Sequence, residues 1–152
     1  MKVSVIGTGY VGLVSGACLA DVGHRVECVD IRPEVVDNIN RCVSPIHEKD
    51  LDELLHKVVS NGSLTATTDL HGAVQGSNIT LVCVGTPTVG SEADLSQIVT
   101  AAESVGRVLA AKKSYHVVAV KSTVLPGTTE GIVRRTIEQS SGKPLNDGWG
   151  CA

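Results

Sequence analysis

Residues 3–12 read VSVIGTGYVG, an apolar run that ends in the pattern Gly-x-Gly-x-x-Gly. A second apolar run, residues 26–29, stops at Asp30. The glycine pattern alone is weak, because chance also produces it, but here it lies between a β-like run and an acidic strand end about 20 residues further on. A strand, a glycine turn, a helix and a second strand in this order form the unit that holds a dinucleotide. A glycine-rich turn without a ligand is the alternative interpretation.

Each glycine of the pattern has a physical role in such a unit. Gly7 permits a tight turn after the strand, Gly9 lets a pyrophosphate approach the backbone, and Gly12 lets the following helix pack against the sheet. The free N–H groups and the dipole at the start of that helix favour an anion. Asp30 is placed to accept hydrogen bonds from a ribose 2′-hydroxyl, and its charge repels a 2′-phosphate. The motif therefore predicts NAD rather than NADP as the cofactor.

Composition limits the classes of function. The chain has 152 residues, enough for one domain with a substantial core, and a formal net charge of −3 without a basic stripe. Nucleic acid and anionic membrane surfaces are therefore not expected as partners. No apolar run approaches the length of a membrane span, and the N-terminus lacks the regions of a signal peptide, so a cytoplasmic protein is expected.

The cysteines and histidines show neither a disulfide nor a metal pattern. The five cysteines are an odd number without a Cys-x-x-Cys pair, and the five histidines lack the spacing of metal ligands. Cys28 and Cys83 lie within apolar strand-like runs, so we expect both to be buried. The sequence predicts no metal site.

Strand-like apolar runs alternate with helix-like stretches. The strand-like runs are residues 3–6, 26–29, 64–67, 79–84 and 117–120, and the helix-like stretches are residues 10–22, 33–41, 50–60, 70–74, 95–111 and 129–139. Asp50 and Glu53 have the spacing of a capping box at the start of one helix. This alternation predicts an α/β fold, a Rossmann-like doubly wound parallel sheet in a single domain over residues 1–152. Trp149, near the end of the chain, is expected to be exposed, where it would promote association.

Polar loops follow the fourth and fifth predicted strands. Gly85, Thr86 and Pro87 follow one of them, and Ser122 and Thr123 follow the next. In a doubly wound sheet, ligands bind at the carboxyl ends of the strands, where the strand order reverses. We therefore expect these loops to converge with the glycine turn on one cleft, although each loop alone also fits a plain strand-to-loop transition.

Five segments together resemble the UDP-glucose/GDP-mannose 6-dehydrogenase family. They are GTGYVG (7–12), VD (29–30), SPIHE (44–48), VCVGTP (82–87) and STVLPGT (122–128), which occur in the family's order across most of the chain. By this resemblance, the whole enzyme oxidises the C6 hydroxyl of a nucleotide sugar to a carboxylate with two NAD, as in polysaccharide biosynthesis.

The resemblance, together with the motifs, assigns the site residues. The expected cofactor contacts are Gly7, Gly9, Tyr10, Val11, Gly12, Asp30, Arg32, Gly85, Thr86, Pro87, Ser122 and Thr123. Thr123 would lie near the nicotinamide and the reacting C6, where its hydroxyl orients a water or stabilises developing charge in a supporting catalytic role. Some members have Lys at the position of Val35, beside the adenosine ribose, and here Arg32 is expected to supply that cation.

The resemblance places the remaining parts of the enzyme outside these residues. In the family, a central helical domain and a C-terminal sugar-binding domain follow, and the latter carries the nucleophilic Cys that the second oxidation requires. The chain is therefore expected to bind NAD but to be inactive with a nucleotide sugar. UDP-glucose is the first expectation for that substrate, ahead of GDP-mannose and UDP-N-acetylmannosamine. The full-length enzyme is expected to be a homodimer or larger.

Two other interpretations stay open on the sequence alone. One is a self-contained NAD- or nucleotide-sensing regulatory domain, which shares the glycine turn and the acidic strand end. The other is the NAD domain of a β-hydroxyacid dehydrogenase, whose Ser-Gly-Gly substrate loop this chain lacks. Neither class calls for VCVGTP and STVLPGT in the same chain.

Overall fold

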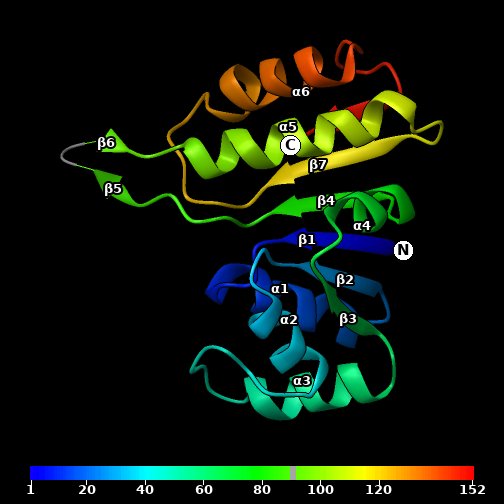
Figure 1. Cartoon of the computed structure of the whole chain (residues 1–152), viewed down its shortest axis with the longest axis vertical. Helices are drawn as coiled ribbons and strands as arrows, with labels where there is room; N and C mark the ends of the chain where they lie inside the picture. Colours follow the sequence, from blue (N-terminus) through cyan, green and yellow to red (C-terminus); the bar gives the residue numbers. More distant parts are fainter. Residues whose placement is uncertain (90–91) are drawn as a thin grey trace.

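The computed structural model describes residues 1–89 and 92–152. Its centre is a six-stranded sheet with the strand order β3-β2-β1-β4-β7-β8 (Figure 1). The strands are β1 (Lys2–Ile6), β2 (Arg25–Val29), β3 (Leu64–Thr67), β4 (Ile79–Val82), β7 (His116–Val120) and β8 (Trp149–Cys151). Every neighbouring pair runs parallel, and the order reverses between β1 and β4. The predicted Rossmann-like doubly wound parallel sheet is confirmed.

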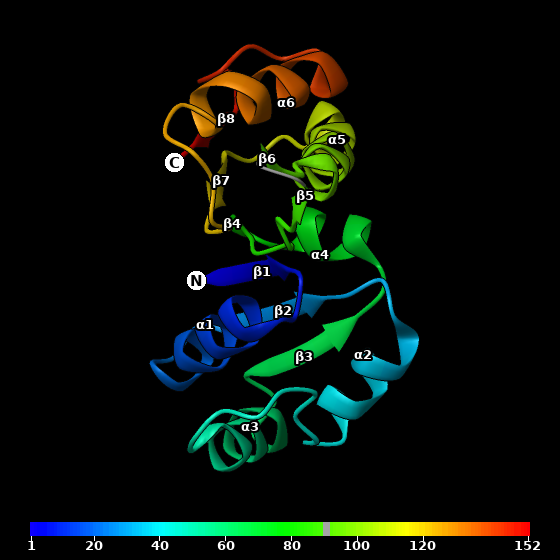
Figure 2. The same ribbon diagram turned by 90° about the vertical axis from the view of Figure 1, so that its left-hand side faces the viewer.

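Helices cover the two faces of the sheet and bury two aliphatic cores. The first core lies under α1 (Tyr10–Asp21), α2 (Pro33–Asn40) and α3 (Leu51–Ser60), and the second under α4 (Leu70–Gly76), α5 (Ser96–Ala111) and α6 (Arg134–Ser141). Both views show α6 lying alongside α5 (Figures 1 and 2). Neighbouring residues of a strand point to opposite faces, so Val5 enters the first core and Ile6 the second.

The starts of α2 and α3 differ in how they are stabilised. Pro33 occupies the first turn of α2, where its missing N–H has no intrahelical partner to lose. Asp50 is the N-cap of α3, but its φ is 63° and its side chain makes no capping hydrogen bond. The predicted capping box of Asp50 and Glu53 is therefore wrong, and α3 is stabilised instead by burial of apolar residues such as Leu55.

The end of the chain also differs from the prediction. Trp149 is fully buried, not exposed, because residues 149–151 form β8 and extend the sheet beside β7. Its ring packs in the second core, and its Nε1 donates a hydrogen bond to the carbonyl of Lys143 at 3.2 Å. A three-residue strand that contains Gly150 has too little pattern to be seen in the sequence.

Three further elements, β5, β6 and η1, follow β4 and β7. β5 (Thr88–Val89) and β6 (Glu92–Ala93) pair in an antiparallel hairpin, which extends away from the main sheet in Figure 1. The last helical stretch begins with η1 (Thr129–Val133), a π-helical turn that continues directly into α6. In the described residues, no helix is both long enough and apolar enough to span a bilayer.

Candidate functional site

The glycine turn connects β1 to α1 at the carboxyl edge of the sheet. Gly7 has a φ of +94°, and a Cβ there would lie 2.7 Å from the carbonyl oxygen of Cys83. At Gly12 a Cβ would collide with the carbonyl oxygen of Gly7. At Gly9, in contrast, a Cβ would meet no atom within 4 Å, and the φ of −74° is open to other residues. Gly7 and Gly12 are therefore required by the fold, whereas Gly9 leaves unfilled space above the turn.

That space lies at the N-terminus of α1. Gly9 is the N-cap, and its carbonyl accepts the first helical hydrogen bond from the N–H of Leu13 at 2.9 Å. No side chain caps this end of the helix, and its first turn holds no acidic residue. Tyr10 and Val11, the first two residues of the helix, are exposed. The first N–H groups of a helix that lacks a cap are available to an anion.

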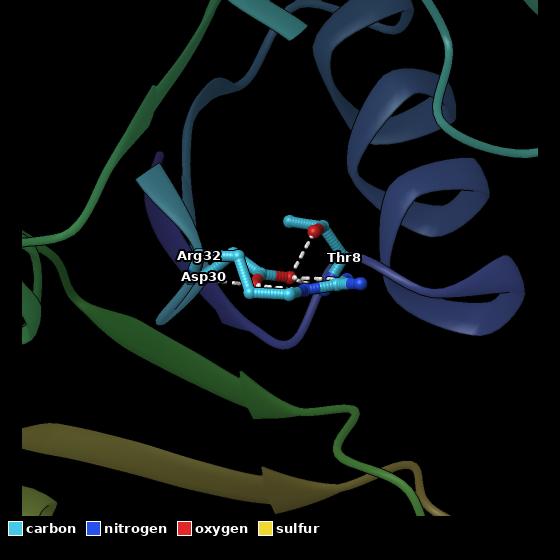
Figure 3. Close-up of polar contacts among 3 residues, drawn as sticks. All are labelled: Thr8, Asp30 and Arg32. Atoms are coloured by element: carbon cyan, nitrogen blue, oxygen red, sulfur yellow. Dashed lines mark hydrogen bonds and ion pairs between the residues drawn. The ribbon is translucent and has the colours of Figure 1, made fainter. Parts of the chain in front are cut away.

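Asp30, directly after β2, is buried to all but 8% and is held by Thr8 and Arg32 (Figure 3). The backbone N–H of Thr8 donates to Oδ2 at 3.3 Å, and the hydroxyl of Thr8 donates to the same oxygen. Arg32 donates to Oδ1 from its backbone N–H and its Nε, both at 3.1 Å, and to Oδ2 from Nη2 at 3.4 Å. Burial alone would raise the pKa of Asp30, but the hydrogen bonds from Arg32 and Thr8 outweigh it and lower the pKa. The carboxylate is therefore charged at neutral pH.

The loops after β4 and β7 are joined to each other by hydroxyl groups. The hydroxyl of Ser122 donates to the carbonyl of Val84 at 2.7 Å, and the hydroxyl of Thr86 donates to the carbonyl of Thr123 at 2.8 Å. The side chain of Thr123 is exposed. These bonds show that the two predicted loops meet. Their convergence with the glycine turn on one cleft stays a prediction.

Gly85 and Pro87 are exposed in the loop after β4. A Cβ at Gly85 would meet Oε1 of Gln97 at 3.5 Å, an ordinary contact, so the local structure does not require glycine there. Pro87 ends the loop, directly before β5. The role of both residues in binding a cofactor stays a prediction.

Two hollows lie away from the glycine turn, so the expected cleft between the loops is neither of them. The first, about 520 Å³, lies at the opposite edge of the sheet, where Lys2, Arg25 and Lys112 are among the lining residues. The second, about 390 Å³, lies between α1 and β4 and is lined largely by apolar atoms, with Leu19 and Leu81 among its residues. The turn itself faces an open surface.

The structure adds one residue, Thr8, to the site and places the guanidinium of Arg32 beside Asp30. Thr8, which the sequence analysis did not single out, is 1% exposed and contributes a backbone and a side-chain donor to Asp30. The glycine pattern allows any residue between Gly7 and Gly9, so only the hydroxyl group of Thr8 could have indicated a role in hydrogen bonding. Val35 lies in the first core and is 6% exposed, so the only candidate of the two for a cation beside Asp30 is Arg32.

Both buried-cysteine predictions are confirmed. Cys28 and Cys83 are buried, and burial raises the pKa of their thiols to about 12 and about 11. Among residues 1–89 and 92–152, no group of His, Cys, Asp and Glu side chains is arranged to hold a metal ion.

The strand order, the glycine turn and the carboxylate after β2 define a dinucleotide-binding domain of the Rossmann type. Residues 1–148 match the NAD binding domain of the UDP-glucose/GDP-mannose dehydrogenase family, and the chain belongs to that family. This membership decides against the sensor and β-hydroxyacid dehydrogenase interpretations, and it confirms NAD as the cofactor of the domain.

Individual relatives agree with the family. The chain is 40% identical to a GDP-mannose 6-dehydrogenase of Pseudomonas syringae, with all of the chain and 35% of the relative covered. It is 41% identical to a UDP-glucose 6-dehydrogenase of Haloferax volcanii, with 97% of the chain and 34% of the relative covered. A crystal structure of GDP-mannose dehydrogenase from Pseudomonas aeruginosa, a ternary complex, superposes with a TM-score of 0.96 at 40% identity, over 99% of this chain and 35% of that one. The chain thus spans about a third of the length of these relatives.

Proposed function

We propose that this domain binds NAD for a nucleotide-sugar 6-dehydrogenase, in which other domains bind the sugar nucleotide and carry the nucleophile. The observation that carries the proposal is the pairing of open space at Gly9 with the charged carboxylate of Asp30 at the same edge of the sheet. The space accepts a pyrophosphate at the start of α1, and the carboxylate accepts hydrogen bonds from the adenosine ribose.

The remaining half of the cofactor extends from the glycine turn toward the loops after β4 and β7. Bound NAD supplies the hydride acceptor for oxidation of a C6 hydroxyl. Ser122 and Thr86 stiffen the two loops through their hydrogen bonds to the facing backbone, which holds Thr123 at the outer surface of the pair. The hydroxyl of Thr123 is the chain's own group for orienting a water or stabilising charge at the reacting carbon.

The nucleotide sugar is one of those that the relatives' names contain, among them GDP-mannose, UDP-glucose and UDP-N-acetylmannosamine. The identities to the GDP-mannose and UDP-glucose relatives, 40% and 41%, are too similar for this domain to distinguish them. UDP-glucose, the first expectation from the sequence, therefore stays a prediction. The contacts that distinguish bases and sugars are expected outside the NAD domain.

We further propose that these 152 residues alone do not oxidise a nucleotide sugar. The second oxidation needs a reactive thiolate, and the cysteine nearest the glycine turn, Cys83, is buried with its pKa raised to about 11. The residues that bind the nucleotide sugar are also expected outside this domain, so the first hydride transfer lacks its substrate as well. Incubation of the purified chain with NAD and either UDP-glucose or GDP-mannose should therefore give no NADH absorbance. Formation of NADH from either sugar would contradict the proposal.

Two glycine substitutions test the proposed pyrophosphate site. Gly9→Ala adds a methyl group in open space, so the free energy of unfolding should change by no more than about 1 kcal/mol, the cost of Ala at an N-cap. NAD should nevertheless bind at least about tenfold more weakly in calorimetry, because the methyl group fills the space that the pyrophosphate needs. Gly12→Ala is the contrasting variant, because it collides with the turn and should lower stability first. Wild-type affinity in Gly9→Ala would overturn the proposed position of the cofactor.

A further inference from the structure

The carboxylate of Asp30 is already saturated with hydrogen bonds from its own chain. Its two oxygens accept two bonds from Thr8 and three from Arg32. An ionised carboxylate offers about four lone-pair positions. A ribose hydroxyl can therefore bond to Asp30 only if one of these donors leaves.

The donors differ in how easily they can leave. Thr8 is 1% exposed and lies within the glycine turn, and the N–H of Arg32 is part of the backbone that leads into α2. The guanidinium of Arg32 is instead on a side chain that is 56% exposed, and it lies across the carboxylate with its head toward Thr8 (Figure 3). An ion pair this exposed is worth little, so the guanidinium is the donor that a ligand displaces.

We propose that Arg32 determines the cofactor specificity of this domain, in two opposite ways. It competes with the adenosine ribose of NAD for Asp30, and it offers a fixed positive charge to a 2′-phosphate. The domain consequently discriminates less against NADP than Asp30 alone would. This inference rests on the proposed binding of the adenosine half of NAD beside Asp30.

The charges around Asp30 support this assignment. Without Arg32, a 2′-phosphate would meet an uncompensated carboxylate, and the repulsion would exclude NADP. With Arg32 paired to it, the two side chains together carry no net charge. A guanidinium stays protonated and binds phosphate through two parallel hydrogen bonds, so a 2′-phosphate can draw it away from Asp30. Glu34, in the first turn of α2, is the other charge that acts on Arg32, and it limits this attraction without removing it.

The test compares Arg32→Met with a matched control, Arg107→Met. Methionine keeps much of the apolar stem but removes every donor and the charge. Arg107 also pairs with one carboxylate, Glu103, and its side chain is 70% exposed, but it lies near the far end of α5. The dissociation constants of NAD and NADP are measured by calorimetry for the wild type and both variants, at low and at physiological salt.

In Arg32→Met, NADP should bind at least tenfold more weakly, and NAD should bind with equal or several-fold higher affinity. The ratio of the two dissociation constants should therefore rise at least tenfold, whereas Arg107→Met should leave it unchanged. Arg32→Lys, which keeps the charge but not the planar pair of donors, should lie between the two. An unchanged ratio in Arg32→Met, or a loss of NAD affinity as large as that of NADP, would overturn the inference. Wild-type protein that binds neither dinucleotide would instead overturn the proposed function.

Discussion

Two buried polar clusters lie at opposite ends of the sheet, and they differ in whether a donor can leave. The carboxyl-edge cluster consists of Thr8, Asp30 and Arg32. The amino-edge cluster consists of Ser4, Ser77, Thr80, Lys112 and His116, none of which is more than 5% exposed. Of the two, only the carboxyl-edge cluster contains an exposed member, the guanidinium of Arg32. It is therefore the one whose hydrogen bonds can be exchanged for those of a ligand.

The amino-edge cluster is closed by internal partners. The hydroxyl of Ser4 lies 2.7 Å from Oγ1 of Thr80, which lies 2.8 Å from Nε2 of His116. Nδ1 of His116 donates to the carbonyl of Ser77 at 3.3 Å, so Nε2 is the acceptor and Thr80 donates to it. Nζ of Lys112 donates to the carbonyls of Ser77 and of the last turn of α4, at 2.7 to 2.9 Å. Because the buried side-chain polar atoms of this cluster bond to partners within the chain, the cluster stabilises the fold.

Lys112→Met should give the largest effect on stability. It leaves buried carbonyls at the end of α4 without a donor, and it should lower the free energy of unfolding by about 3 kcal/mol. Urea denaturation measures this loss, and NAD affinity of the folded variant should stay at the wild-type value. Lys113→Met is the matched control, since Lys113 is the exposed neighbour and its substitution should be nearly neutral. Equal stabilities of the two variants would remove the contrast between the clusters.

Asp30→Ala should lower the affinity for NAD rather than the stability of the fold. It should weaken NAD binding by about 1–3 kcal/mol, roughly a 5- to 150-fold rise in Kd, because the ribose loses its carboxylate acceptor. Asp21→Ala is the control, since Asp21 also forms an ion pair, with Lys57 at 2.5 Å, but lies at the other end of α1. Calorimetry of the two variants measures the difference, and a thermal melt confirms that each is folded. Unchanged NAD affinity in Asp30→Ala would mean that the ribose is held elsewhere.

The glycine turn and the acid after β2 were predictable, because they follow from local sequence. The turn at Gly7, the helix start at Gly9 and the acid at Asp30 have roles that depend on neighbouring residues and on one strand pairing. Thr8 was missed because its role arises only when β1 and β2 align and bring it to a residue 22 positions away. Arg32 was expected only as a cation beside the adenosine ribose, and its hydrogen bonds to Asp30 were not predicted.

The elements that the sequence did not reveal depend on packing between distant segments. β8 forms because Trp149 fills the second core beside β7. A strand of three residues is too short to show the alternation of apolar and polar residues by which a strand is predicted. The left-handed conformation of Asp50 is set by the path of the chain into α3, against the preference that the capping spacing indicated. His116 joins Thr80 only because β4 and β7 are neighbours in the sheet, a relation that spacing along the chain does not contain.

The smallest predicted effect is the pH dependence that His116 gives to folding. Its burial, with the nearby charge of Lys112 as a second cause, lowers the pKa of the imidazole from 6.5 to about 4. Between these values the unfolded chain binds a proton that the folded chain does not, so stability falls as the pH falls from 6.5 towards 4. From pH 7 to pH 5 this residue should account for about 1–2 kcal/mol of lost stability.

Urea denaturation of the wild type and of His116→Gln at pH 7 and pH 5 measures how much of the lost stability comes from His116. The variant starts from a lower stability at pH 7, since the carbonyl of Ser77 loses the donor at Nδ1, but its stability should fall less between pH 7 and pH 5 than that of the wild type. His71→Gln, at an exposed position in α4, should keep the wild-type slope. If the stability of His116→Gln fell with pH as steeply as that of the wild type, the amino-edge cluster would have to admit water and a proton. The contrast with the carboxyl-edge cluster would then depend on Lys112 alone.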